Sequence, residues 1–369
     1  KLGIIGTGTI GQEHMRVAQV LGRARVQGIF DPQPQSVAVA LANFATLGGD
    51  APVVYSSLEE ACADSRVDAF MICTPNYTHL DVLKAVAGSG KPIFLEKPMA
   101  TTLADAAATI DLARSYTAFI QIGLQYRYKA QYVEARQEVL ARRTLGEVSM
   151  ISMSEFRPPF LDKVGQWNKF NEFSGGTLVE KCCHYFDLMN IFADSRPTRV
   201  YASAAASGVF AALEADGRRS DIDDSALVIV EYESGCRASF ALNMNCPDFN
   251  EELSIVGSEG RLVAHERFDP HHAQRAHCSL ELELGERGAS RKIELGYASA
   301  IEGSGHHGAT YYEHAAFLDR IEGKAVEAAT PEQGLWSMLV ASAAQESSRS
   351  GQAVDIGDYA ASNDLTRLL

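Results

Sequence analysis

Lys97 is the residue best suited to proton transfer in the first third of the chain. It stands between Glu96 and Pro98 at the end of an apolar run, and the proline ring stiffens the backbone beside it. A lysine that is shielded from water next to another cation releases its proton readily and can act as an acid or a base. Glu96 is better suited to holding Lys97 or a ligand hydroxyl than to chemistry of its own. The alternative is an ordinary surface lysine in a turn.

A second group of reactive residues follows the pair Gly175-Gly176. Glu180 precedes His184 by four residues and Asp187 follows it by three, so a helix would carry all three side chains on one face. A carboxylate one turn before a histidine fixes its tautomer and supports its cationic form. We therefore predict that His184 is a general base assisted by Glu180, with a structural histidine as the alternative. A Glu/His pair provides too few ligands for a metal ion, and we expect no metal site.

The element that would bring a cofactor to these residues lies at the N-terminus. Leu2, Ile4 and Ile5 form a short apolar strand, GTGTIG follows at 6–11, and a helical pattern then ends at Gly22. Strand, glycine turn and helix in this order are the context in which a dinucleotide binds. The first glycine permits the tight turn, the second lets the pyrophosphate approach, and the third lets the helix pack against the strand.

Asp31 ends the next predicted strand, residues 25–31, and lies 20 positions after Gly11. An acid at this distance holds the ribose hydroxyls of the adenosine. Residues 26–65 contain no Lys or Arg, so a 2′-phosphate would meet a carboxylate and no local cation. We therefore predict NAD rather than NADP as the cofactor. The alternative role for Asp31 is to cap a helix.

Strands and helices alternate through the rest of the first domain, so its sheet should be parallel and doubly wound. Predicted strands at 67–75, 91–98 and 118–128 are separated by helical segments. Ligands bind beyond the carboxyl ends of such strands. Together with the glycine turn, these strand ends provide the predicted cofactor-binding residues, which are Gly6, Gly8, Thr9, Ile10, Gly11, Asp31, Thr74, Pro75, Asn76, His79, Glu96 and Lys97.

From about residue 147 the pattern changes to alternating polar and apolar residues that are divided by short turns. This pattern indicates an antiparallel sheet. We therefore expect an α/β Rossmann dinucleotide-binding domain at 1–124 and an α+β domain with an open, mostly antiparallel β-sheet at 125–369. A long helix near the C-terminus should follow Thr330 as its cap and stop at Gly351.

Composition argues against several classes of protein. The 369 residues carry a net charge of −14, so there is no excess of cations to replace the counterions of a nucleic acid. No apolar run is long enough to span a membrane. The seven cysteines are scattered and form no Cys-x-x-Cys pair, so we expect reduced thiols in a cytoplasmic protein.

The segments GTGTIG, CTPNYTH, EKP and GLQYRY, and the stretch 165–190, resemble the glucose–fructose oxidoreductase / inositol dehydrogenase / rhizopine-catabolism family (Gfo/Idh/MocA). The resemblance implies an NAD(P)-dependent dehydrogenase with a cis Lys97–Pro98 bond and a triad of lysine, acid and histidine. Glu180 stands where aspartate is common in the family, and its extra methylene moves the carboxylate by about 1 Å. The resemblance also implies a homo-oligomer, a dimer or tetramer, formed through the sheet of the second domain.

Several side chains outside the two reactive groups are candidates for contact with substrate. Trp167 can stack on a sugar or on nicotinamide, although a packing role explains it equally well. The resemblance implies that polar side chains near His306 and His307 reach the sugar. The predicted substrate-binding residues are Tyr126, Arg127, Trp167, His184, His306 and His307.

We predict an enzyme that oxidises a secondary hydroxyl of a sugar, cyclic polyol or glycoside by hydride transfer to NAD. Lys97 and His184 would provide the acid–base chemistry, with Glu180 assisting. One alternative is oxidation of a glycoside at C3 followed by elimination, as a glycosidase or a 3-oxo-glycoside-forming enzyme. The other alternative is a non-catalytic protein that senses NAD.

Overall fold

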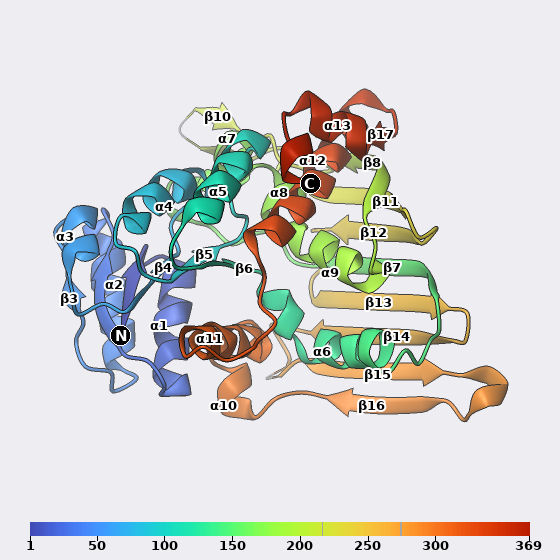
Figure 1. Cartoon of the computed structure of the whole chain (residues 1–369), viewed down its shortest axis with the longest axis horizontal. Helices are drawn as coiled ribbons and strands as arrows, with labels where there is room; N and C mark the ends of the chain where they lie inside the picture. Colours follow the sequence, from blue (N-terminus) through green and yellow to red (C-terminus); the bar gives the residue numbers. More distant parts are fainter. Residues whose placement is uncertain (216, 274) are drawn as a thin grey trace. The chain divides into compact units, whose positions relative to one another are not determined.

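The chain divides into two compact units, each with its own sheet (Figure 1). A computed structural model describes residues 1–215, 217–273 and 275–369. The first unit comprises Lys1–Tyr128 and Ala298–Leu335, with Leu368, and the second comprises Lys129–Tyr297 and Trp336–Arg367, with Leu369. The single predicted boundary at 124/125 therefore differs from the observed division, in which a late segment returns to the first unit. The reason is that the helix of this segment packs against the first helix of the chain.

The first unit is built on six parallel strands in the order β3-β2-β1-β4-β5-β6. Strands β2 and β3 are added on one side of β1, and β4, β5 and β6 on the other, so the order in which strands are added reverses between β1 and β4. Ligands bind at such a point in doubly wound folds. The strands are β1 (Leu2–Ile5), β2 (Val26–Phe30), β3 (Val53–Val54), β4 (Ala69–Ile72), β5 (Ile93–Glu96) and β6 (Ile120–Gly123). The helices are α1 (Thr9–Leu21), α2 (Pro34–Ala45), α3 (Leu58–Ala63), α4 (His79–Ala87), α5 (Leu103–Ser115), α10 (Ser299–Glu302) and α11 (Ala309–Ile321).

Strands β1, β4, β5 and β6 are buried along their whole length, as expected for parallel strands covered on both faces, although Glu96 in β5 and Gln121 in β6 are polar. The parallel, doubly wound arrangement is confirmed. One element differs, because the strand predicted to reach residue 128 ends at Gly123. There the Leu124 N–H bonds back to the Ile122 carbonyl, and a 3₁₀ turn, η2 (Gln125–Tyr128), follows.

The second unit contains a nine-stranded sheet in the order β16-β15-β14-β13-β7-β12-β11-β8-β17. The β7–β12 pair is parallel and the other pairs of this sheet are antiparallel, so the prediction of an open, mostly antiparallel sheet is confirmed. Its strands are β7 (Val148–Phe156), β8 (Pro197–Ala205), β11 (Ser225–Tyr232), β12 (Arg237–Asn243), β13 (Phe249–Gly257), β14 (Gly260–Phe268), β15 (His277–Glu283), β16 (Arg291–Leu295) and β17 (Val354–Asp355). A separate short pair is formed by β9 (Glu214–Ala215) and β10 (Arg218–Arg219).

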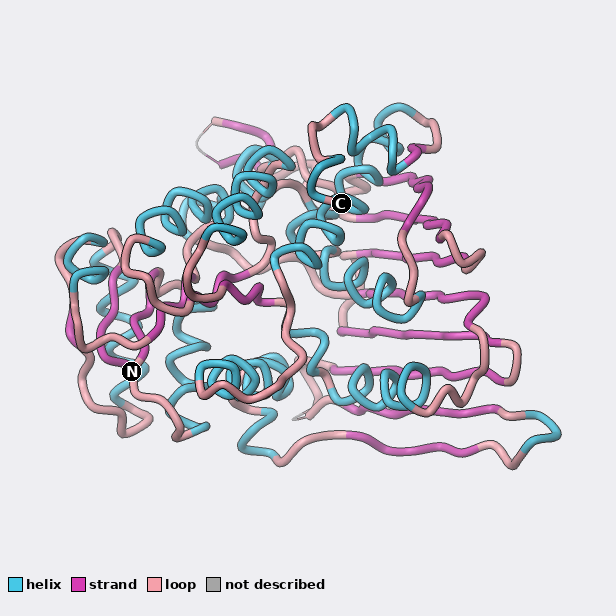
Figure 2. The backbone as a smooth tube through the Cα atoms, in the orientation of Figure 1, coloured by secondary structure: helices cyan, strands magenta, loops and turns pink. Residues whose placement is uncertain are grey.

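Helices cover one face of the nine-stranded sheet, as Figure 2 shows for the helices in front of the strands. The helices that lie wholly or mostly in this unit are α6 (Ala130–Arg136), α7 (Asn171–Ser174), α8 (Thr177–Glu180), α9 (Cys183–Ala193), α12 (Pro331–Ser350) and α13 (Ile356–Ser362). Of these, α6 contacts β14 and β15, and α9 contacts β7. The predicted C-terminal helix is confirmed as α12, which is followed by Gly351 at φ 69°.

The two faces of the large sheet differ because side chains alternate along each strand. On β7, Ile151 and Met153 are buried, whereas Met150 is 54% exposed. On β11, Leu227 and Ile229 are exposed at 65% and 49%. Apolar side chains therefore remain on the face that the helices do not cover.

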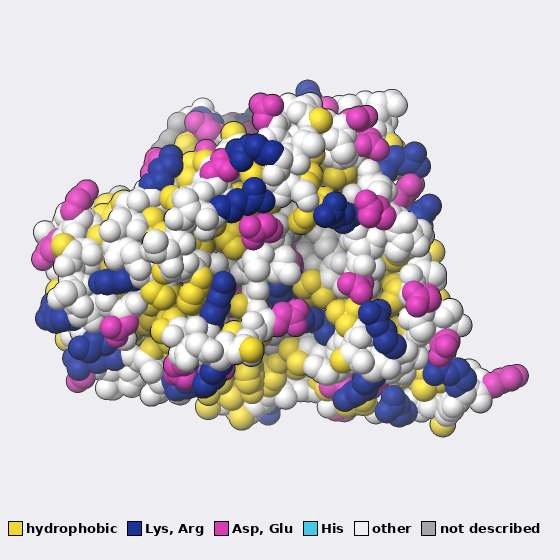
Figure 3. All heavy atoms as spheres, viewed as in Figure 1, with side chains coloured by type: hydrophobic (Ala, Val, Ile, Leu, Met, Phe, Trp, Pro, Cys, Tyr) yellow, Lys and Arg dark blue, Asp and Glu magenta, His cyan; other side chains and the backbone are white. Residues whose placement is uncertain are grey.

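The charged side chains and the cysteines are arranged as follows. Figure 3 shows Lys and Arg side chains interspersed with Asp and Glu over the face in view. Each of the seven cysteines is a free thiol. Across the described ranges, we find no helix with both the length and the apolar character needed to cross a membrane.

Candidate functional site

The glycine turn of the first unit has the geometry that a dinucleotide requires. Gly6 has a φ of +92°, and a Cβ there would lie 2.7 Å from the backbone of Cys73. A Cβ on Gly11 would lie 2.0 Å from the Gly6 carbonyl oxygen, so only glycine lets α1 pack this closely. Gly8 precedes α1 without a side-chain cap, and a Cβ on it would meet no chain atom within 4 Å. The uncapped helix start and the open side of Gly8 fit a pyrophosphate.

Alanine at position 8 should separate cofactor binding from folding. Because the φ of Gly8 is −64° and its Cβ would meet open space, Gly8→Ala should keep the wild-type melting temperature. The added methyl group would face the approaching pyrophosphate, so we expect NAD affinity to fall about tenfold or more. Calorimetric titration with NAD and a thermal melt measure the two effects. Gly11→Ala is the matched variant and should lose stability as well; wild-type NAD affinity in Gly8→Ala would contradict the assignment.

Asp31 ties the glycine turn to the end of β2. Its Oδ2 accepts from the Thr7 N–H at 2.7 Å and from the Thr7 hydroxyl at 3.2 Å. Its Oδ1 accepts from the Gln33 N–H at 2.8 Å, just before α2. The N-cap of α2 is Gln33 and makes no side-chain cap bond, so Asp31 braces the turn before the helix and does not cap it. Contact of Asp31 with a ribose stays a prediction.

The residues after β4 form a compact turn before α4. The Thr78 hydroxyl oxygen lies 2.7 Å from the Pro75 carbonyl oxygen, to which it donates, and 2.8 Å from Thr74 Oγ1, and Asn76 is buried nearby. His79 is fully buried, and each of its ring nitrogens faces a backbone carbonyl. His79 therefore belongs to the framework of this turn, and its predicted contact with the cofactor stays a prediction.

Lys97 follows β5 at the same end of the parallel sheet as the glycine turn. The Lys97–Pro98 peptide is cis, as the family resemblance implied. The Lys97 N–H donates to Glu96 Oε2 at 3.1 Å, and Glu96 Oε1 lies 2.7 Å from Nε2 of His14. Glu96 thus holds Lys97 through its backbone, as one of its two predicted roles requires.

The second group of reactive residues begins at two glycines with positive φ. Gly175 and Gly176 have φ values of 83° and 84°, and a Cβ on Gly176 would lie 2.2 Å from Gln345. The single helix predicted after them is wrong, because the chain forms α8 and then α9. At the break, the Cys182 N–H bonds to the Thr177 carbonyl five residues back, which interrupts the regular pattern.

His184 lies in the first turn of α9 and Glu180 is the last residue of α8. Both side chains are buried, and so is Asp187. Lys163 lies 3.8 Å from the Glu180 carboxylate and 4.5 Å from the centre of the Trp167 ring. Glu180, whose side chain is one methylene longer than that of aspartate, thus places its carboxylate near Lys163, a lysine from a loop. Sequence reasoning did not identify Lys163, because no local pattern connects it with Glu180.

A buried ion pair also supports this region. Lys181 Nζ lies 3.0 Å from Glu155 Oε1, and both side chains are nearly inaccessible to solvent. Burial would raise the pKa of Glu155, but the charges of Lys181 and Arg157 lower it below its ordinary value. The ammonium group of Lys181 is therefore directed at β7.

Four predicted substrate residues belong to the first unit. His306 Nδ1 lies 2.7 Å from Glu13 Oε1. Burial raises the pKa of Glu13, but the charge of His306 and its hydrogen bond outweigh this effect and lower the pKa to about 2. Tyr126 is buried with its ring 6.5 Å from that of His306, and Arg127 donates to Gln333 at 2.8 Å. These contacts place the segment around α11 next to α1. His307 follows His306 with a φ of 52°.

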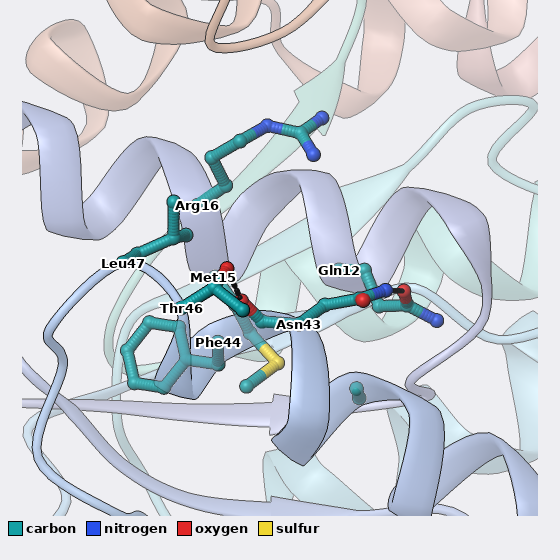
Figure 4. Close-up of a pocket in the computed structure, with 8 residues that line it drawn as sticks. Gln12, Met15, Arg16, Asn43, Phe44, Thr46 and Leu47 are labelled. Atoms are coloured by element: carbon teal, nitrogen blue, oxygen red, sulfur yellow. Dashed lines mark hydrogen bonds between the residues drawn. The ribbon is translucent and has the colours of Figure 1, made fainter.

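A cavity of about 310 Å³ lies between α1 and α2 (Figure 4). Gln12 and Asn43 face one another across it and share a hydrogen bond of 2.8 Å. Phe44 and Met15 provide apolar lining. The cavity contains none of the predicted site residues. In the part of the chain that the structure covers, no three His, Cys, Asp or Glu side chains are arranged to hold a metal ion.

The fold and the glycine turn define a dinucleotide-binding protein. The chain belongs to the Gfo/Idh/MocA family: residues 1–124 match its NAD-binding Rossmann fold and residues 137–356 match its C-terminal alpha/beta domain. NAD is thus the cofactor of the first unit.

Individual relatives agree with this assignment. Inositol 2-dehydrogenase of Acidiphilium cryptum is 28% identical over 263 residues, which cover 70% of this chain and 72% of that protein. Levoglucosan dehydrogenase in complex with NADH has a TM-score of 0.77 at 19% identity, covering 96% of this chain and 98% of that one. The WlbA dehydrogenase of Bordetella pertussis, in complex with NADH and UDP-GlcNAcA, has a TM-score of 0.73 at 20% identity, covering 96% and 98%. The two structures show the same fold.

Proposed function

We propose that this dehydrogenase oxidises a secondary hydroxyl of a sugar, cyclic polyol or glycoside. The observation that carries the proposal is Lys97 at the end of a parallel strand, with its backbone held by Glu96, at the same edge of the sheet as the glycine turn. Relatives named inositol 2-dehydrogenase and levoglucosan dehydrogenase support this class of substrate.

The residues of the first unit would hold NAD through its phosphates and one ribose. The backbone of Gly6, Gly8, Thr9, Ile10 and Gly11 would receive the pyrophosphate, because the start of α1 has no side-chain cap. The carboxylate of Asp31 would hold the adenosine ribose and disfavour a 2′-phosphate, since residues 26–65 contain no cation. When bound, NAD supplies the acceptor for the hydride that leaves the carbinol carbon. Thr74, Pro75 and Asn76 would line the same edge.

We assign the proton chemistry to Lys97 and His184. As the carbon–hydrogen bond breaks and the carbonyl forms, the hydroxyl proton passes to His184 or to Lys97. The positive charge of Lys97 stabilises the negative charge that develops on the oxygen. Glu180, whose carboxylate lies 3.8 Å from Lys163, would support the charged form of His184. Tyr126, Arg127, Trp167, His306 and His307 are proposed as substrate contacts.

A screen of polyols, aldoses and glycosides with NAD, followed by NADH absorbance, tests the proposed function. We expect NADH to accumulate in proportion to the hydroxyl compound consumed, with NADP much less effective. Free sugar released from a glycoside without net NADH would instead support the glycosidase alternative. NAD binding without turnover of any member of the screen would support a sensing protein.

We also propose that the protein is a cytoplasmic homo-oligomer, a dimer or tetramer, that associates through the uncovered face of the large sheet. Leu227, Ile229, Met150 and Tyr201 expose apolar surface there. Burying such surface between two copies is favourable by about 25 cal/mol per Å². Light scattering should show a dimer or tetramer for the wild type and a monomer for Leu227→Glu combined with Ile229→Lys. A wild-type monomer, or an unchanged oligomer in the double variant, would contradict this.

A further inference from the structure

The backbone on both sides of Lys97 is held by buried side chains. On one side, its N–H donates to Glu96 Oε2 at 3.1 Å, and the other oxygen of Glu96 lies 2.7 Å from His14 Nε2. On the other side, the Pro98 carbonyl oxygen lies 2.8 Å from His79 Nδ1. Both imidazoles are fully buried. Two histidines, one from α1 and one from α4, thus contact the turn that carries Lys97.

Both ring nitrogens of His14 have buried partners. Its Nδ1 lies 2.6 Å from Nε2 of His314, and the planes of the two rings are inclined by 20°. Burial alone would lower the pKa of His14, but Cys73 and Glu96 raise it well above its ordinary value. Burial and the charge of His14 lower the pKa of His314 well below its ordinary value. His14 therefore joins the carboxylate of Glu96, through Nε2, to the ring of His314, through Nδ1.

His79 links the turn to the end of β4. Its Nδ1 faces the Pro98 carbonyl at 2.8 Å and its Nε2 faces the Thr74 carbonyl at 3.0 Å. Burial lowers the pKa of His79, although both carbonyl contacts oppose this. A neutral imidazole carries one N–H, so it serves one carbonyl at a time, and the shorter distance favours Pro98.

We propose that His14 and His79 are positioning residues, which fix the peptide groups flanking Lys97 and thereby direct its side chain. The inference rests on the catalytic role proposed for Lys97. His14 acts through the carboxylate of Glu96, and His79 acts through the carbonyl of Pro98. An error of about 1 Å in the position of a catalytic group can cost about a hundredfold in rate, so the contribution of the two histidines is measurable.

Amide replacements test each contact separately, because an Asn amide nitrogen overlays Nδ1 of histidine and a Gln amide nitrogen overlays Nε2. At position 79 the Nδ1 contact reaches the turn. We therefore expect His79→Asn to keep kcat within about threefold and His79→Gln to lose about tenfold or more. At position 14 the Nε2 contact reaches Glu96, so His14→Gln should keep kcat and His14→Asn should lose it. KM for NAD should stay within about threefold throughout.

The decisive result is that Asn keeps kcat better than Gln at position 79, whereas Gln keeps kcat better than Asn at position 14. A purely structural role would rank Asn and Gln in the same order at both positions, and that order, or four equal values of kcat, would overturn the proposal. A thermal melt of each variant shows whether a loss of kcat reflects unfolding.

A second readout needs neither cofactor nor turnover. Reductive methylation with ¹³C-formaldehyde labels lysine amines, and the Lys97 signal is the one that Lys97→Met removes. This signal should move in His79→Gln and His14→Asn and keep its position in the other two variants, with exposed Lys84 as an unchanged control. An unmoved Lys97 signal in all four variants overturns the inference. A wild type that oxidises no hydroxyl compound would instead refute the proposed function.

Discussion

Replacing Lys97 with methionine should lower turnover about a hundredfold or more and leave NAD affinity unchanged. Methionine keeps most of the length and the apolar body of lysine but has no ammonium group. The oxygen of the substrate then loses both a proton carrier and the charge that stabilises it in the transition state. The glycine turn and Asp31, which would hold NAD, do not depend on this ammonium. NADH absorbance gives kcat, and calorimetric titration gives the affinity for NAD.

Lys84→Met is the matched control for this change. Lys84 lies on α4 in the same unit, its side chain is 55% exposed, and its nearest carboxylate is 4.0 Å away. Its removal should leave both kcat and NAD affinity at the wild-type values. If Lys97→Met turned over within about threefold of the wild type, Lys97 would have no part in proton transfer or charge stabilisation.

The second large effect is expected for His184→Gln, which should also lower kcat about a hundredfold or more. Glutamine is polar and can replace one hydrogen bond of the ring, but it cannot accept and return a proton near neutral pH. NAD affinity should be unchanged, because the glycine turn belongs to the other unit. A thermal melt checks that loss of this buried side chain has not unfolded the protein.

Two comparisons make the result for His184 interpretable. His272→Gln, at a side chain that is 84% exposed, should have wild-type kcat. The double variant Lys97→Met with His184→Gln should lose far less than the product of the two single losses, because residues that act as a unit are not additive. Fully multiplicative losses would mean that the two residues serve separate steps.

The parallel fold was predictable because its local patterns allow few structures. The residues Leu2–Ile5 form a continuous apolar run, and such a run followed by a glycine turn and a helix is characteristic of a buried parallel strand. Gly6 and Gly11 occupy positions where a Cβ would strike the backbone. The position of Lys97 was predictable for the same reason, because the carboxyl ends of all parallel strands lie at one edge of the sheet and Lys97 directly follows β5.

The parts that could not be predicted depend on contacts between distant residues. His14 stands three residues after the glycine turn, but its partner His314 lies 300 residues further along the chain. Only the packing of α11 against α1 brings them together, and no local pattern indicates that packing. The contacts of His79 were unpredictable for a related reason: its two ring nitrogens face the carbonyls of Thr74 and Pro98, and sequence spacing does not reveal these contacts.

The second group of reactive residues shows where helical spacing fails as a guide. Glu180 and His184 are four apart, which is one turn of a regular helix. The backbone instead changes its hydrogen-bond pattern at Cys182, and Glu180 receives a lysine from the loop before it. A regular pattern of residues could not predict that interruption, because both halves remain helical.

The most direct measurement is a crystal structure of the protein with NAD and a polyol that the screen identifies. The account predicts that Lys97 Nζ and a ring nitrogen of His184 both lie within about 2.6–3.2 Å of the same hydroxyl oxygen, on the carbon that faces the nicotinamide. A bound polyol whose nearest hydroxyl contacts neither side chain, or whose two contacts fall on different hydroxyls, would contradict it.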